Sequence, residues 1–171
     1  TCLPFGLSDA PRAFTKVLAP VAARLRRLGC RLMTYLDDWL LAAKSPDHVK
    51  QLTAQAVHLL ETLGFVVNRK KSVLMPTMTV AFLGMVINTG SMMINWPVNK
   101  AKKVQHECRR ILTHGSIAEP ELRCLLGKME AARFAVKSAP LHFRGLQYLL
   151  LDHWPMSGAP TSHQYVPLSP W

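Results

Sequence analysis

The chain has 171 residues, of which 49% are hydrophobic, so it is long and apolar enough to fold around a core and is not wholly disordered. Its 21 Lys and Arg residues outnumber its 10 Asp and Glu residues and give a net charge of +11, which favours a polyanionic partner, nucleic acid first and an anionic membrane surface second. No apolar run reaches the ~18 residues of a membrane-spanning helix, and no signal peptide is visible. The four cysteines lack the spacing of a zinc site, and we interpret them as reduced thiols of an intracellular protein.

The N-terminal segment predicts a loop that runs into a helix. Ser8 or Asp9 is the expected N-cap, and Pro11 suits the first turn, where its missing N–H costs nothing. Six apolar residues then follow at helical spacing: Phe14, Val17, Leu18, Val21, Leu25 and Leu28. Gly29 ends the element, and we expect Pro20 to kink or divide the helix.

An apolar run from Arg31 to Ala42 is interrupted in its middle by Asp37 and Asp38. This pattern predicts two short buried strands joined by a hairpin turn that carries the two acids. Two carboxylates about 4 Å apart repel by roughly 4 kcal/mol at an effective dielectric near 20, and a hard divalent cation offsets that repulsion. A polar hairpin tip with two solvated acids is the commoner case for so short a motif, and on these residues alone both interpretations stay open.

The next segment predicts one helix and several short extended elements. The helix has Ser45 as its N-cap and Gly64 at its end. The elements after it are, in order, a strand at residues 65–67, a basic turn at 68–72, a strand from Val80 to Ile87, and a hairpin turn at 88–91 into residues 92–94.

From Asn95 onward the pattern is helical. Pro97 opens a helix that ends at Gly115, and we expect one of its faces to be buried: Val98, Ala101, Val104, Cys108, Ile111 and Leu112. Ser116 and Glu119 form a capping-box pattern for the following helix.

Gly127 lies inside that following helix, where it costs about 1 kcal/mol relative to Ala and so suggests close approach to another backbone. A last helix is predicted over residues 141–152. Four prolines beyond Trp154 indicate a linker.

Four motifs follow one another along the chain: Leu3-Pro4-Phe5-Gly6-Leu7 with Ala10, Pro11 and Phe14; Tyr35-Leu36-Asp37-Asp38; Asn68-x-x-Lys71-Ser72 with Phe82-Leu83-Gly84; and Leu122-x-x-Leu125-x-Gly127-Lys128-Met129. In this order and spacing they resemble the reverse transcriptase family, over residues 2–152. Taken in order, the four motifs are similar to the family's nucleotide-binding loop, to its Tyr-x-Asp-Asp catalytic hairpin, to its lysine-bearing loop with the primer grip, and to a thumb helix of the retroviral and gypsy-type enzymes. Residues 139–147 further resemble retrotransposons of the DIRS group.

The resemblance implies an α+β fold with three parts. Residues 1–94 would be a partial polymerase palm, an antiparallel sheet with helices on one face. Residues 95–153 would be a helical thumb, and residues 154–171 a Pro-rich linker.

The implied chemistry is RNA-directed DNA polymerisation, in which a primer 3′-hydroxyl attacks a nucleotide α-phosphate with the help of two Mg²⁺ ions, for which Mn²⁺ can substitute. Asp37 and Asp38 are the implied catalytic residues and metal ligands. The other implied contacts are Phe5, Gly6, Tyr35 and Lys71 for the nucleotide; Phe82, Leu83, Gly84 and Met85 for the primer grip; and Lys102, Lys103, Arg110 and Lys128 for the nucleic-acid backbone. Lys70 is the alternative to Lys71, which is equally an ordinary surface lysine, and Leu83 and Met85 are alternatively core residues.

The family's third catalytic carboxylate would lie upstream of Thr1, so we expect a palm fragment that is inactive by itself. The implied partners are an RNA or DNA primer–template and dNTPs, within an intracellular (cytoplasmic or nuclear) polyprotein that also carries RNase H and integrase or recombinase domains. The alternative function is a non-catalytic nucleic-acid-binding remnant of a retroelement.

Overall fold

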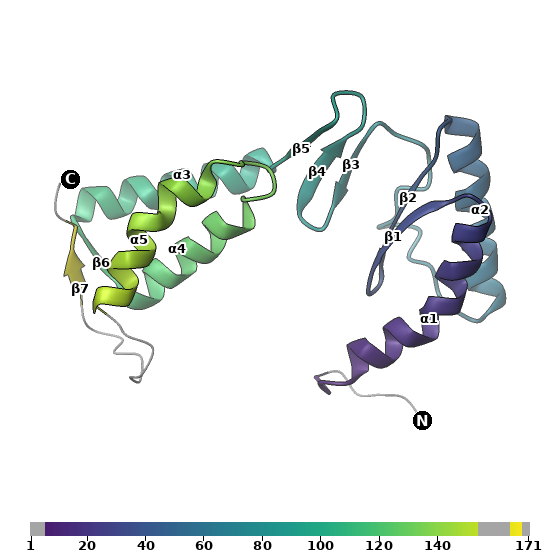
Figure 1. The fold of residues 1–171 in the computed structure, drawn as a ribbon, viewed down its shortest axis with the longest axis horizontal. Coiled ribbons are helices and arrows are strands. Elements are labelled where there is room, and N and C mark those ends of the chain that lie inside the picture. Colours follow the sequence, from purple (N-terminus) through teal and green to yellow (C-terminus); the bar gives the residue numbers. More distant parts are fainter. Residues whose placement is uncertain (1–5, 154–164, 169–171) are drawn as a thin grey trace. The chain divides into compact units, whose positions relative to one another are not determined.

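The computed structural model describes residues 6–153 and 165–168, so Phe5 of the first motif lies outside the described residues. The chain divides into two compact units, residues 1–83 and 84–171, each with its own core (Figure 1). The expected boundary after residue 94 differs from this division, because the hairpin of β4 (Met85–Asn88) and β5 (Met93–Asn95) belongs to the second unit. Helices and short antiparallel strand pairs confirm the predicted α+β class. No helix in the described ranges is long and apolar enough to cross a membrane.

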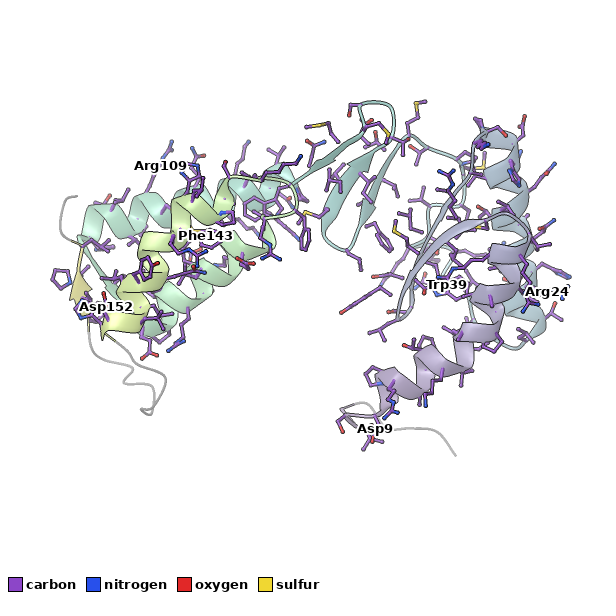
Figure 2. All side chains as sticks on the ribbon, in the orientation of Figure 1. Asp9, Arg24, Trp39, Arg109, Phe143 and Asp152 are labelled. Carbon is purple, nitrogen blue, oxygen red and sulfur yellow. The ribbon has the colours of Figure 1, made fainter. Side chains whose placement is uncertain are left out.

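The first unit packs two helices, α1 (Ala10–Arg27) and α2 (Pro46–Thr62), against one hairpin. The hairpin strands are β1 (Arg31–Tyr35) and β2 (Asp38–Ala42), which pair antiparallel. Their shared core is small: Ala22, Leu25, Cys30, Leu32, Leu52 and Ala56. Trp39 packs against this core from β2 (Figure 2). The hairpin is therefore held by helix packing rather than by a larger sheet.

The helix ends agree only in part with the sequence predictions. Ser45 caps α2 as expected, because its hydroxyl accepts a hydrogen bond from the His48 backbone N–H at 3.3 Å. Asp9 is the N-cap of α1, but its side chain makes no capping hydrogen bond. Of the two expectations for Pro20, a kink or a division of α1, the division is wrong, since the helix continues through Pro20. Buried residues on both sides, including Leu18 and Val21, stabilise the turn that Pro20 weakens.

Two predicted strands have different outcomes. Residues 65–67 form no strand, because a β-branched run needs a neighbouring strand to pair with, and Val66 is 97% exposed. The single strand expected from Val80 to Ile87 is two strands, β3 (Thr79–Phe82) and β4, separated by a two-residue turn at Leu83 and Gly84. The predicted turn after residue 88 is confirmed, with β5 beyond it.

The hairpin of β1 and β2 is less buried than its apolar composition predicts. Leu32 is the buried residue of the two strands, and residues on the opposite face, such as Met33, stay exposed. Successive side chains of a strand point to opposite faces, and α1 and α2 cover only one face of this two-stranded sheet. The expectation of two buried strands is therefore wrong for one face.

The second unit is built around three helices, α3 (Val98–His114), α4 (Glu119–Ala131) and α5 (Ala139–His153). Its core contains residues from all three, including Phe143 of α5 (Figure 2). β6 (Ser116–Ala118) pairs antiparallel with β7 (Tyr165–Pro167), and the Leu168 N–H donates to the Gly115 carbonyl oxygen at 2.8 Å. Val166 is buried in this core. The described part of the predicted linker is therefore packed against the helices.

Details of α3 and α4 correct the sequence predictions. Val98 and Leu112 were expected on the buried face of α3, but both are exposed. The predicted capping box of Ser116 and Glu119 is not formed, because Ser116 is in β6 and the N-cap is Ala118, which has no capping side chain; Glu121 accepts a hydrogen bond from the Ala118 N–H at 3.5 Å.

Gly127 makes no close backbone approach, because a Cβ at this position would have nothing within 4 Å. The end of α3 is confirmed, with Gly115 in the left-handed conformation at φ 67°.

Two leucines that the sequence pattern treats alike provide a test of this core. Leu122 is fully buried, whereas Leu112 is 72% exposed. We expect Leu122→Ala to lower the free energy of unfolding of the 171-residue chain by about 2–5 kcal/mol, and Leu112→Ala to change it by less than about 0.5 kcal/mol. Urea unfolding followed by circular dichroism measures both, and similar losses for the two variants would contradict the observed packing.

Candidate functional site

The two acids are positioned by a tight turn. Asp38 is the first residue of β2 and pairs with Tyr35, so Leu36 and Asp37 alone form the turn. Leu36 has φ 49°, a left-handed conformation that costs a non-glycine residue about 1–2 kcal/mol. The Trp39 indole N–H donates to the Leu36 carbonyl oxygen at 3.3 Å and fixes this conformation. Both carboxylates are consequently presented at the exposed tip of the hairpin.

A cleft of about 500 Å³ lies in the first unit beside this tip. Asp37 and Asp38 line it together with Lys71 of the basic turn and Phe82 of β3. The remaining lining is mostly apolar and comes from α1, α2 and the segment between α2 and β3; it includes Phe14, Leu18, Val49, Leu60, Phe65 and Val73. Four residues that the sequence predicted from two separate motifs therefore share one cleft.

The basic turn at residues 68–72 has the local structure that its sequence predicts. The Asn68 side chain accepts a hydrogen bond from the Lys71 N–H at 3.2 Å, and the Asn68 carbonyl accepts one from the Ser72 N–H at 3.1 Å. Arg69 is paired with Glu61 at 2.7 Å. The charge that this turn contributes to the cleft is therefore that of Lys71.

Other predicted site residues are not brought to this cleft. Gly6, at φ 93°, and Tyr35 are both exposed and do not line it. Leu83 is also exposed, so its alternative assignment as a core residue is wrong, whereas Met85 is partly buried. Gly84 and Met85 belong to the second unit.

Phe14 is a cleft residue that helical spacing alone assigned to the core. It is 36% exposed and lines the cleft beside Leu18. Its membership of the first sequence motif was the only signal that separated it from the other apolar residues of α1.

The donor set at the hairpin tip fits a hard divalent cation. Mg²⁺ prefers oxygen ligands and is commonly bound by one or two carboxylates together with substrate phosphates and water. Asp37 and Asp38 supply such a pair at the edge of an open cleft. In residues 6–153 and 165–168, no group of three or more His, Cys, Asp or Glu side chains could hold a metal ion. The described ligands are thus the two aspartates alone.

The basic residues predicted to contact nucleic acid form a shallow groove on α3 and α4. It is lined by Lys102, Lys103, His106, Glu107, Arg110 and Lys128. The Lys128 ammonium lies 2.6 Å from Glu107, and the Arg110 guanidinium lies 2.8 Å from Glu121. The hydrogen bond from Arg110 lowers the pKa of the Glu121 carboxyl.

Two of the four basic residues, Arg110 and Lys128, have a carboxylate partner. The hydrogen bond that Lys128 donates to Glu107 raises the pKa of Lys128, and the one that Arg110 donates to Glu121 raises the pKa of Arg110. Within the described part of the chain, Lys102 and Lys103 form no ion pair. The sequence pattern did not reveal that Glu107 and Glu121 neutralise half of the predicted basic set.

Comparison with known proteins gives two findings. The family model described as "Reverse transcriptase (RNA-dependent DNA polymerase)" matches residues 1–87, about half of the chain. Over 90 residues, or 52% of its length, the chain is 31% identical to the Gag-Pro-Pol polyprotein of human T-cell leukemia virus 2. The chain spans only 6% of that polyprotein.

The conformation of Leu36 yields a prediction about the turn. Asn tolerates the left-handed conformation, whereas a β-branched residue does not. We expect Leu36→Asn to keep the free energy of unfolding close to that of the parent chain, and Leu36→Val to lower it by about 1–2 kcal/mol. Urea unfolding of the 171-residue chain measures both variants. Equal stabilities would show that Leu36 does not have a positive φ.

Proposed function

Because the chain belongs to the reverse transcriptase family, we propose that it is part of an RNA-directed DNA polymerase that extends a primer on an RNA or DNA template. One observation carries the proposal: the acid pair of the hairpin, the lysine of the basic turn and Phe82 of β3 line a single cleft. These are the residue types that nucleotidyl transfer needs, namely metal ligands, a cation near the phosphates and an apolar support. The reaction joins a primer 3′-hydroxyl to a nucleotide α-phosphate.

The aspartates would hold the metal ions of this polymerase. Asp37 would be the principal ligand and Asp38 the supporting one, with Mg²⁺ as the natural ion and Mn²⁺ as a substitute. Bound there, two such ions stabilise the attacking and leaving oxygens of the displacement. The rigid turn at Leu36 contributes by keeping both carboxylates at the cleft edge without reorganisation.

The remaining cleft residues have supporting roles. Lys71 would neutralise or protonate the departing pyrophosphate, which its position on the cleft wall supports. Phe82 would support the primer end by packing. Phe5, Gly6 and Tyr35 would contact the nucleotide, and Leu83, Gly84 and Met85 would complete the primer grip; these roles rest on the family motifs.

The second unit would be the thumb, whose groove holds the phosphate backbone without reading sequence. Lys102 and Lys103 would supply most of the attraction, because Arg110 and Lys128 already have carboxylate partners.

We further propose that the chain acts within a larger intracellular polyprotein, cytoplasmic or nuclear, of a DIRS-group or gypsy-like retrotransposon. The similarity to a Gag-Pro-Pol polyprotein supports the polyprotein setting. RNase H and integrase or recombinase domains would accompany it. The 171 residues by themselves would not extend a primer, since two carboxylates without a third leave the metal ions loosely fixed.

The metal assignment predicts a specific loss of activity. In a complete polymerase that contains this chain, Asp37→Asn should reduce Mg²⁺-dependent primer extension at least 100-fold, because an amide is a poor Mg²⁺ ligand. Asp38→Asn should reduce it less. Asp47→Asn is a matched control, since Asp47 lies in the first turn of α2 and does not line the cleft.

Incorporation of labelled dNTP on a primed template measures these rates. Extension by Asp37→Asn within a few-fold of the parent enzyme would contradict the metal assignment. A parent protein that binds primer–template tightly but never extends it would instead support the non-catalytic remnant.

The groove predicts how binding depends on salt. Neutralising Lys102 and Lys103 together to Gln should reduce the slope of log affinity against log salt by about 1.5–2 for duplex DNA, because two phosphate contacts are lost. Neutralising Arg110 and Lys128 together should reduce it less, because both are paired in the free protein. Lys16 and Lys50, in the first unit, form the charge-matched control pair. Equal slopes for all three double variants would exclude the groove as the binding face.

A further inference from the structure

The second unit contains a contact between its first residue and the start of α3. The Lys100 ammonium donates a hydrogen bond to the Gly84 carbonyl oxygen at 3.1 Å, although the two residues are 16 apart in sequence. Gly84 is in the turn that precedes β4, and Lys100 is in the first helical turn of α3. The contact therefore ties the turn to the helix.

Gly84 leaves room for this contact. A Cβ built on it would lie 2.5 Å from the Lys100 Nζ atom, a separation that real Cβ atoms essentially never show. The next atom of the same side chain, Cε, is at 3.9 Å, an ordinary contact. Glycine at residue 84 thus accommodates both the positive φ of 77° and the approach of the ammonium group.

Both partners of the contact are held by their surroundings. Leu83 and Gly84 have φ values of 47° and 77°, so both central residues of the two-residue turn are left-handed, as in type I′ turns. On the other side, the Lys100 N–H donates to the Pro97 carbonyl and to the Asn99 side chain, each at 2.9 Å. The ammonium group consequently extends from a fixed helix N-terminus to a fixed turn.

We infer that Lys100 is a positioning residue for the primer grip: it holds the Gly84 carbonyl against the first turn of α3. The inference rests on the proposed function for its consequence, since Gly84 lies inside the predicted primer-grip segment Phe82 to Met85. The geometry of the contact does not depend on that function.

The first test measures the contact itself. Lys100→Met removes the ammonium group but keeps the rest of the side chain to Cε, and Lys137→Met is a charge-matched control in the same unit. If the hydrogen bond stabilises the closed form of the turn, its loss should speed hydrogen exchange of the neighbouring backbone amides about 2–10-fold. We expect that acceleration for residues 84–88 of the 171-residue chain in Lys100→Met, and none in Lys137→Met. Unchanged exchange in Lys100→Met would overturn the inference.

A double-mutant cycle tests whether Gly84 and Lys100 are coupled. Gly84→Ala should destabilise the chain through its positive φ and because the flexible Lys100 Nζ must move away from the added Cβ and lose its hydrogen bond to the Gly84 carbonyl. The second effect disappears in a Lys100→Met background, so the double variant should be less destabilised than the sum of the two single variants. Gly127→Ala is the control, because its Cβ meets nothing within 4 Å and its effect should add independently. Full additivity between Gly84→Ala and Lys100→Met would contradict the contact.

The last test concerns the consequence for the primer. We expect Lys100→Met to weaken binding of a 3′-recessed primer–template to the chain about 2–10-fold more than binding of a blunt duplex, measured by fluorescence anisotropy. Lys137→Met should affect both ligands equally. Faster exchange with no preference between the ligands would overturn the role in the primer grip. Failure of the parent chain to bind either ligand, with the exchange result intact, would count against the proposed function instead.

Discussion

The constraint on which the proposed active site depends is the two-residue turn that places one carboxylate, Asp37, in the turn and the next, Asp38, at the start of β2. In a continuous strand, neighbouring side chains would point to opposite faces. The turn at Leu36 and Asp37 breaks that alternation, and it does so with a leucine at φ 49°. Such a conformation persists only where the surroundings enforce it. Here the hydrogen bond from the Trp39 indole and the packing of α1 and α2 against the hairpin provide that enforcement.

The same constraint explains why the acids, the lysine and the apolar wall meet. The small core of Leu25, Leu32 and Leu52 fixes the hairpin on its helices. Asn68 then folds the basic turn so that Lys71 lines the cleft, while Arg69 is engaged by Glu61. The result is an open site with two negative groups and one positive group, which suits a metal-bound triphosphate better than a neutral ligand. In the proposed function, the basic groove of the second unit would add an attraction for phosphate.

Local signals in the sequence predicted the elements well and their exposure poorly. The caps at Ser45 and Gly115, the hairpin turn at Asp37 and the Asn68 turn were all predictable, because each depends on residues within a few positions. Leu112 and Met33 were assigned to the core because periodicity identifies an apolar face but not whether another element covers it. The strand pair of β6 and β7 could not be predicted, since it joins residues about fifty apart in a segment that prolines make look like a linker. The four shared cleft residues were predicted through motif resemblance, whereas Phe14 and the ion pairs of Glu107 and Glu121 required the structure.

The most direct test of the central claim is paramagnetic broadening by Mn²⁺ in nuclear magnetic resonance spectra of the isotopically labelled 171-residue chain. The account predicts that substoichiometric Mn²⁺ broadens the signals of Asp37, Asp38, Lys71 and Phe82 together, because these residues line one cleft. Replacing both aspartates by Asn should abolish the broadening at Lys71 and Phe82. Broadening at those two residues that survives the double replacement would contradict the assignment of the hairpin acids as the metal ligands.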